Sequence, residues 1–111
     1  MSPSIRRRAP DPSALFAALG DPTRLALVRR LAAENFLSVA ALTAGTRISR
    51  QAVTKHLDIL ARAGLVESAR HGRERLWMLS PGQIEQARRA LDQISHDWDD
   101  ALGRLRRLVE R

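Results

Sequence analysis

Residues 38–64 read SVAALTAGTRISRQAVTKHLDILARAG. Ser38 and Ser49 each stand where a helix can begin, because a serine hydroxyl accepts a hydrogen bond from a free amide of the first helical turn. Gly45 and Gly64 each stand where a helix can end, because glycine readily adopts the backbone conformation that closes a helix. The stretch therefore predicts a short helix and a longer one joined by a tight turn, which is a helix-turn-helix pattern.

The longer helix, residues 49–63, has an apolar side and a polar side. At 100° per residue, Val53, Leu57 and Leu60 fall within one stripe that we expect to pack inward. The exposed polar side chains are Arg50, Gln51, Thr54, Lys55, Asp58 and Arg62. A helix that reads duplex DNA needs this layout, with donors near its N-terminal end facing the major groove. An ordinary amphipathic helix with a solvated polar face would show the same pattern, so the helix alone leaves both interpretations open.

Individual side chains at the start of this helix suit contacts with bases. Arg50 can donate two hydrogen bonds to guanine, Gln51 can pair with adenine, and Thr54 can contact a thymine methyl group. Lys55 suits a phosphate, and the helix N-terminus at Ser49 offers backbone amides to the same anion. We therefore predict that these five residues contact DNA.

A β-hairpin is predicted after this helix, with strands 65–70 and 73–79 joined through His71 and Gly72. We call residues 66–79 the wing. The basic side chains around its turn are Arg70, His71, Arg73 and Arg75. Trp77 is expected to anchor the second strand in the core. This excess of positive charge on a narrow hairpin favours the interpretation that the wing contacts the DNA backbone over the alternative that its charges are simply solvated.

Helices are also predicted on both sides of these elements. Asp11-Pro12 and Asp21-Pro22 each combine a capping residue with a first-turn proline, giving one helix that ends at Gly20 and a second that ends at Glu34-Asn35. The apolar face of the second helix is expected to carry Leu25, Val28, Leu31 and Ala32. Ser80-Pro81 opens a last helix that continues to the end of the chain. The predicted fold is mainly α with a small β-hairpin.

The last helix carries apolar residues at alternating steps of three and four. They are Ile84, Ala87, Leu91, Ile94, Trp98, Ala101, Leu105 and Leu108. A helix over residues 81–111 would extend ~46 Å, which is longer than so small a body can cover. We therefore expect it to pair with a second copy, although packing on its own domain is the alternative. Antiparallel pairing near residue 102 would oppose three aspartates, at 97, 99 and 100, to the arginines at 104, 106 and 107.

The charge of the chain is unevenly distributed. The net charge is +7, and residues 1–80 hold thirteen basic and six acidic side chains, whereas residues 81–111 hold six of each. A basic body with a neutral appendage is typical of a protein that faces a polyanion. Residues 1–10 are expected to form a disordered basic arm, in which Arg6 to Arg8 either contact DNA or are simply solvated.

Several classes of function are disfavoured by the composition. The chain has no cysteine, so disulfides and thiolate metal sites are excluded. No apolar run approaches the ~20 residues of a membrane helix, and we expect a cytoplasmic protein. No catalytic motif predicts an enzyme or a cofactor site. A protein-docking or RNA-binding module is the main rival, but A-form RNA denies side chains its major groove.

Three stretches together resemble one family. Residues 19–24 read LGDPTR, residues 48–57 read ISRQAVTKHL, and residues 63–66 read AGLV. In this order they resemble the ArsR-type winged helix-turn-helix regulators of bacteria, over about residues 13–80.

The resemblance implies a homodimeric repressor of transcription, often released from DNA by a bound ligand. It implies base contacts from residues 49–56 and phosphate or minor-groove contacts from residues 70–75. It also implies dimerisation through the first and last helices, which brings Leu15 and Phe16 into the predicted interface beside the last-helix residues.

The metal-sensing chemistry of the family is where this chain departs from it. The recognition helix lacks the cysteine pair of metal-sensing members. Asp92, His96 and Asp100 share one helical face at metal-ligand spacing, but a solvated face with ion pairs is the preferred interpretation. We therefore expect no metal or other cofactor, and the sequence does not identify a small-molecule effector.

In domain terms, the sequence predicts the arm at 1–10, a DNA-binding body at 11–80, and a dimerisation helix at 81–111 that belongs to the same domain.

Overall fold

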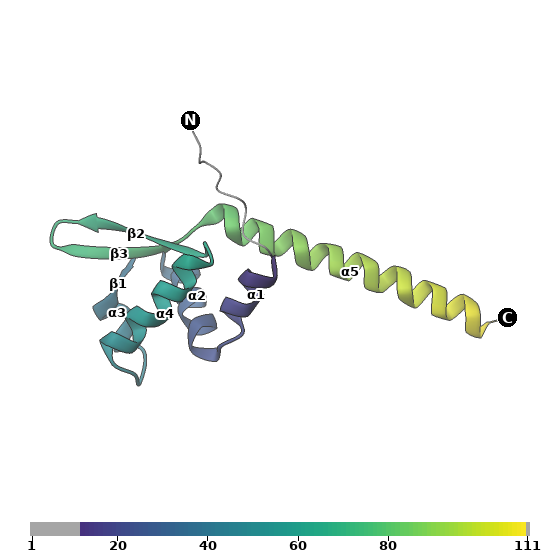
Figure 1. Cartoon of the computed structure of the whole chain (residues 1–111), viewed down its shortest axis with the longest axis horizontal. Coiled ribbons are helices and arrows are strands. Elements are labelled where there is room, and N and C mark those ends of the chain that lie inside the picture. The colour runs from purple at the N-terminus through teal and green to yellow at the C-terminus, as the bar shows by residue number, and fades with distance from the viewer. Residues whose placement is uncertain (1–11, 111) are drawn as a thin grey trace, which may run out of the picture.

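The computed structural model of the chain describes residues 12–110, and the basic arm predicted for residues 1–10 lies outside them. Figure 1 shows a body of four helices and a small sheet, from which one long helix projects. The helices are α1 (Pro12–Leu19), α2 (Pro22–Glu34), α3 (Val39–Ala44), α4 (Arg50–Arg62) and α5 (Pro81–Val109), and the strands are β1 (Leu37–Ser38), β2 (Val66–His71) and β3 (Glu74–Leu79). The mainly α fold with a β-hairpin is confirmed.

Three of the predicted helix starts are confirmed by capping hydrogen bonds. The side chain of Asp21 accepts from the Arg24 amide at 3.0 Å, and those of Ser38 and Ser49 accept from amides three residues later at 3.1 Å. Such a bond satisfies one of the backbone donors that a helix N-terminus leaves free. Gly64 follows α4 with φ of 80°, as its predicted role in ending that helix requires.

The core is aliphatic and is shared by all the helices of the body. Its fully buried side chains are Leu15, Leu27, Leu31, Leu42, Val53, Leu57, Leu60 and Leu65. Trp77 is 6% exposed, which confirms it as the anchor of β3. Leu25 and Ala32 do not belong to the buried face of α2, since both are exposed. That face is centred near Leu31, and Leu25 lies about 120° around the helix from its centre.

The wing is part of a three-stranded antiparallel sheet in the order β1-β3-β2. The pairing of β2 with β3 places Arg70 opposite Arg75, and Gly72 makes the turn with φ of 63°. The sequence did not predict β1, whose Leu37 pairs with Trp77 on the other edge of β3. A strand of two residues is too short to show an alternating pattern of apolar and polar positions.

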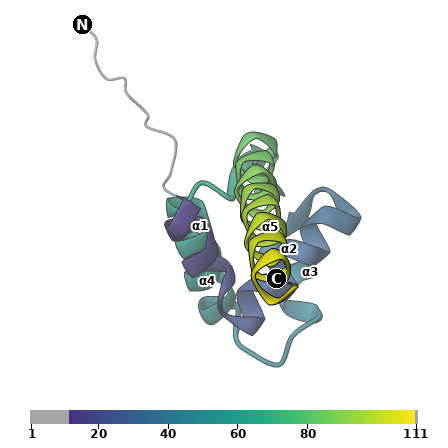
Figure 2. The same cartoon turned by 90° about the vertical axis from the view of Figure 1, so that its right-hand side faces the viewer.

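Helix α5 packs on the body only along its first part, where it contacts α1. Ala87 is nearly buried there, whereas every residue from Leu91 to Asp100 is exposed. Figure 1 shows the remainder of the helix extending away from the body, and Figure 2 views the molecule from that end. Its 29 residues span about 43 Å at 1.5 Å per residue.

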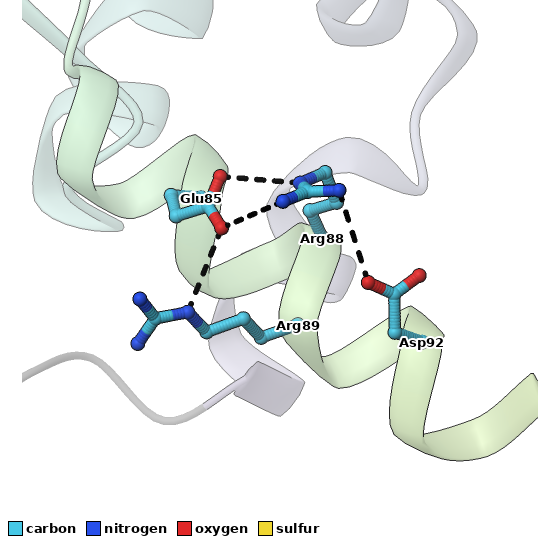
Figure 3. Close-up of polar contacts among 4 residues, drawn as sticks. All are labelled: Glu85, Arg88, Arg89 and Asp92. Carbon is cyan, nitrogen blue, oxygen red and sulfur yellow. Dashed lines mark hydrogen bonds and ion pairs between the residues drawn. The ribbon is translucent and has the colours of Figure 1, made fainter. Parts of the chain in front are cut away.

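Ion pairs connect charged side chains along the first turns of α5 (Figure 3). Glu85 receives two hydrogen bonds from Arg88, at 3.2 and 3.1 Å, and lies 3.5 Å from the Nε of Arg89. Arg88 in turn lies 3.9 Å from Asp92. The hydrogen bond from Arg88 lowers the pKa of Glu85, with smaller contributions from the nearby charges of Arg88 and Arg89.

Some residues predicted to join two subunits lie inside one chain instead. Leu15 is fully buried and Ala87 is 7% exposed, so neither side chain has surface to offer a second subunit. Both belong to the hydrophobic core of the body, and α1 contacts α5. Phe16 and Ile84 are half-buried against the same core. The sequence pattern did not separate the inner turns of α5 from the outer ones, because both carry apolar residues at the same spacing.

Candidate nucleic-acid interface

Helix α4 presents a polar outer face because its inner face is fixed in the core. Val53, Leu57 and Leu60 have no exposed surface. Arg50, Gln51 and Lys55 are exposed, Ser49 caps the helix, and Thr54 is half-buried. The two faces are therefore those predicted. Direct contact of these five residues with DNA stays a prediction.

The preceding short helix is attached to α2 by Arg30, a residue to which the sequence analysis gave no role. Its Nη1 donates to the carbonyl oxygens of Ala41 and Leu42 at 3.1 and 3.3 Å, and its Nε lies 3.2 Å from Glu34. These carbonyls belong to the last turn of α3, where carbonyl groups lack the partner four residues later, and that of Leu42 also accepts from the Gly45 amide. Gly45 leaves room for the guanidinium, since a Cβ there would lie 2.5 Å from Nη1. Arg30 thus stabilises the end of α3 just before the turn into α4.

The middle of α4 is joined to the start of α2 by a polar cluster. Arg24 donates from Nε to the carbonyl of Ala18 at 2.6 Å, and its Nη1 lies 3.4 Å from Nδ1 of His56. The same nitrogen of His56 lies 4.0 Å from Asp21. The hydrogen bond from the Arg24 amide lowers the pKa of Asp21, and the positive charge of Arg24 adds to the effect.

The wing presents the second basic surface. Arg70, His71, Arg73 and Arg75 are all exposed. Arg75 donates to the hydroxyl of Ser68 at 2.8 Å, which orients its guanidinium along the hairpin. Glu74 is the one acidic residue in this turn and lies opposite His71 in the register. The wing therefore has an excess of positive charge at its tip, as the sequence predicted.

The aspartates and histidine of α5 do not gather into a metal-binding group within the described chain. Among residues 12–110, no three His, Cys, Asp or Glu side chains lie close enough to hold a metal ion. His96 instead lies 3.5 Å from Asp100, while Asp92 approaches Arg88. No helix in the described part of the chain is long and apolar enough to cross a membrane.

A helix-turn-helix followed at once by a basic hairpin defines the chain as a winged helix-turn-helix protein, a class that binds duplex DNA. Comparison with known proteins agrees with this. A family of proteins described as containing a helix-turn-helix domain matches residues 19–69.

Two curated proteins of Mycobacterium tuberculosis and one solved structure are similar over most of the chain. HTH-type transcriptional regulator Rv2034 is 36% identical over 103 residues, which cover 93% of this chain and 91% of that protein. HTH-type transcriptional repressor SmtB is 35% identical over 88 residues, covering 79% of this chain and 63% of the repressor. An ArsR-like transcriptional regulator from Rhodococcus sp. RHA1 superposes with a TM-score of 0.74 at 33% identity, covering 87% of this chain and 91% of that one.

The chain belongs to the ArsR family of winged helix-turn-helix transcriptional regulators. It is a DNA-binding regulator and not an enzyme.

Proposed function

We propose that this regulator is a homodimeric repressor that binds a palindromic operator through α4 and the wing. Residues 11–80 would form the DNA-binding body, and residues 81–111 the dimerisation helix of the same domain. Its proposed DNA contacts are Ser49, Arg50, Gln51, Thr54, Lys55, Arg70, His71, Arg73 and Arg75.

The proposal of a dimer rests on the apolar stripe along the projecting part of α5. Leu91, Ile94, Trp98, Leu105 and Leu108 are each between 54% and 64% exposed. Soluble proteins rarely leave so continuous an apolar row in water, and such rows mark association surfaces. A second copy of the same helix would cover the row and place two copies of α4 on one side of the assembly.

Charge on the same helix supports an antiparallel arrangement of the two copies. Asp97, Asp99 and Asp100 precede Arg104 and Arg106, and all five are exposed. In an antiparallel pair the acidic part of each helix faces the basic part of the other. Two recognition helices related by this two-fold axis would read half-sites about one helical turn, ~34 Å, apart.

Repression is supported by family membership and by the similarity to SmtB, which is a transcriptional repressor. The described residues form the DNA-binding body and α5. Occupancy of a promoter by a dimer of such chains is sufficient for repression. Release by a small-molecule effector is part of the family's usual behaviour and is proposed here without an assigned site.

The test is a titration of labelled duplexes with the purified protein, followed by fluorescence anisotropy at several salt concentrations. The duplexes are the region upstream of the protein's own gene and a shuffled sequence of equal length. Preferential binding of one dimer to the native duplex, together with lower transcription from it in a purified system, is the expected result. Equal and weak binding to both duplexes would overturn the proposal and turn attention to RNA or protein partners.

A further inference from the structure

The recognition helix is held in the body by contacts of two different kinds. Val53, Leu57 and Leu60 bury its inner face, and apolar burial has little directional preference. Apolar burial alone therefore does not fix the rotation of α4 about its own axis. Base contacts, however, tolerate only about 0.5 Å and 10–20° of misplacement. A directional contact is needed to fix the angle of the helix.

Arg24 supplies a contact of this kind. Nη1 of Arg24 lies 3.4 Å from Nδ1 of His56. Because an arginine side chain only donates, this contact is a hydrogen bond in the tautomer of His56 whose Nδ1 carries no proton. The other arm of the guanidinium donates to the carbonyl of Ala18 at 2.6 Å. That carbonyl lies in the last turn of α1, where it lacks a helical partner. One rigid side chain therefore bridges the end of α1 and the middle of α4.

Asp21 completes the cluster from the other side. Its carboxylate accepts from the Arg24 amide and lies 4.0 Å from His56, so the start of α2 is fixed next to the same imidazole. His56 is half-buried and lies directly after Lys55 and two residues after Thr54 in α4. Displacing His56 would displace the residues proposed to contact DNA.

We propose that Arg24 is a positioning residue that sets the angle of the recognition helix by bridging Ala18 and His56. It determines discrimination between DNA sequences more than general affinity for DNA. This inference rests on the proposed function of α4. Because α1 packs on α5, the bridge also ties the angle of α4 to the helix proposed to form the dimer.

The test compares two substitutions at position 56. One keeps a hydrogen-bond acceptor for Arg24 but is less favourable in a helix, and the other is more favourable in a helix but removes the acceptor. In His56→Asn, the amide oxygen takes about the place of Nδ1 and can still accept from Arg24. His56→Leu keeps the bulk and favours the helix more than asparagine does, but it removes the acceptor. If His56 only stabilises the fold, the leucine variant should discriminate between DNA sequences better than the asparagine variant. If His56 accepts from Arg24, the asparagine variant should discriminate better.

Arg24→Gln is compared with Arg29→Gln, because both remove one positive charge from α2 and Arg29 is exposed. The measured quantity is the ratio of dissociation constants for shuffled and native duplexes. Arg24→Gln and His56→Leu should lower this ratio about tenfold, within the range that one base contact contributes. Arg29→Gln should leave the ratio unchanged, and His56→Asn should keep most of it. Wild-type ratios in Arg24→Gln and His56→Leu would overturn the proposal.

Hydrogen exchange of the α4 amides without DNA separates this inference from the proposed function. Faster exchange of residues 50–56 in Arg24→Gln and His56→Leu than in His56→Asn is expected. Identical exchange in all three variants would refute the bridge even if the wild type discriminates between duplexes. A wild type that does not discriminate would refute the proposed function, whatever the exchange rates.

Discussion

Arg70 and Arg75 lie directly opposite each other on β2 and β3, which makes two positively charged residues cross-strand neighbours in the wing. Like charges at such a position typically destabilise a hairpin by about 0.2–1 kcal/mol. An arrangement that costs stability in the free protein is understandable if an anion lies between the two guanidinium groups in the complex. The wing is therefore expected to be more stable, and less effective, when one arginine is removed.

Arg70→Gln should raise the melting temperature slightly while weakening binding to every duplex by a similar factor. The dependence of log affinity on log salt concentration should become shallower by about one, as expected for one lost phosphate contact. Thermal unfolding and anisotropy at three salt concentrations provide both numbers. A loss confined to the native duplex would show that Arg70 reads sequence instead.

Arg50→Ala should act in the opposite way, by relaxing sequence preference. Loss of a two-bond contact with guanine costs about 1–3 kcal/mol at one position of the operator and little elsewhere. Binding to a set of duplexes with single base-pair changes would identify that position. Arg62→Ala is the matched control, because Arg62 is exposed in the last turn of the same helix. Equal losses from the two variants would contradict base reading by Arg50.

Trp98→Glu should convert the dimer to a monomer. The substitution places a charge in the middle of the apolar stripe, where Trp98 is 63% exposed in the single chain. His96→Glu introduces a charge at a position about 160° away around α5 and should leave the dimer intact. Light scattering coupled to size-exclusion chromatography distinguishes the two masses. A dimeric Trp98→Glu protein would place the subunit contact elsewhere.

The stability of α5 should decrease at acid pH. The pKa of Glu85 is lowered in the folded protein, chiefly by its hydrogen bonds with Arg88. The carboxylate therefore contributes stability above its ordinary pKa of 4.5, and this contribution is lost as the pH falls through the lowered value. Thermal unfolding from pH 7 to pH 3 should be less pH-dependent in Glu85→Gln. Superimposable pH profiles would show that the ion pairs of Figure 3 do not stabilise the fold.

Gly103→Ala should stabilise α5 by about 1 kcal/mol, because glycine is unfavourable inside a helix. A Cβ at this position would meet only the end of Arg107, at an ordinary distance of 3.6 Å. Helix content by circular dichroism and the midpoint of urea unfolding should both rise. A destabilised variant would indicate that a neighbouring subunit approaches the backbone closely at residue 103.

Most of the fold could be predicted from local sequence patterns, because capping residues and glycines indicate where the helices begin and end. Asp21, Ser38 and Ser49 cap helices as expected, and Gly64 closes α4. Such caps depend on residues within three or four positions, which a sequence displays directly. The burial of α2 was less predictable, since Leu25 and Leu27 are equally apolar and only the neighbouring elements decide which of them faces inward.

The polar contacts that connect distant segments were not predictable. Arg24 and His56 are 32 positions apart, and nothing in either local pattern indicates that they meet. Arg30 bonds to backbone carbonyls eleven and twelve residues away, and no local pattern in the sequence distinguishes it from Arg24 or Arg29 for this role. Which apolar residues of α5 are buried also depends on the body, because the helix contacts α1 along its first part, where Ala87 is nearly buried, whereas Leu91 is exposed.

The proposed dimer would make the regulator sensitive to its own abundance through the projecting half of α5. In a lone subunit every residue from Leu91 to Asp100 is exposed, and most of the stability of a helix in a protein comes from tertiary packing. Formation of the proposed dimer would order this part of α5 and add the second recognition helix, and the population of the dimer would rise with the square of the subunit concentration. Promoter occupancy would respond to gene dosage more steeply than proportionally, before any effector acts.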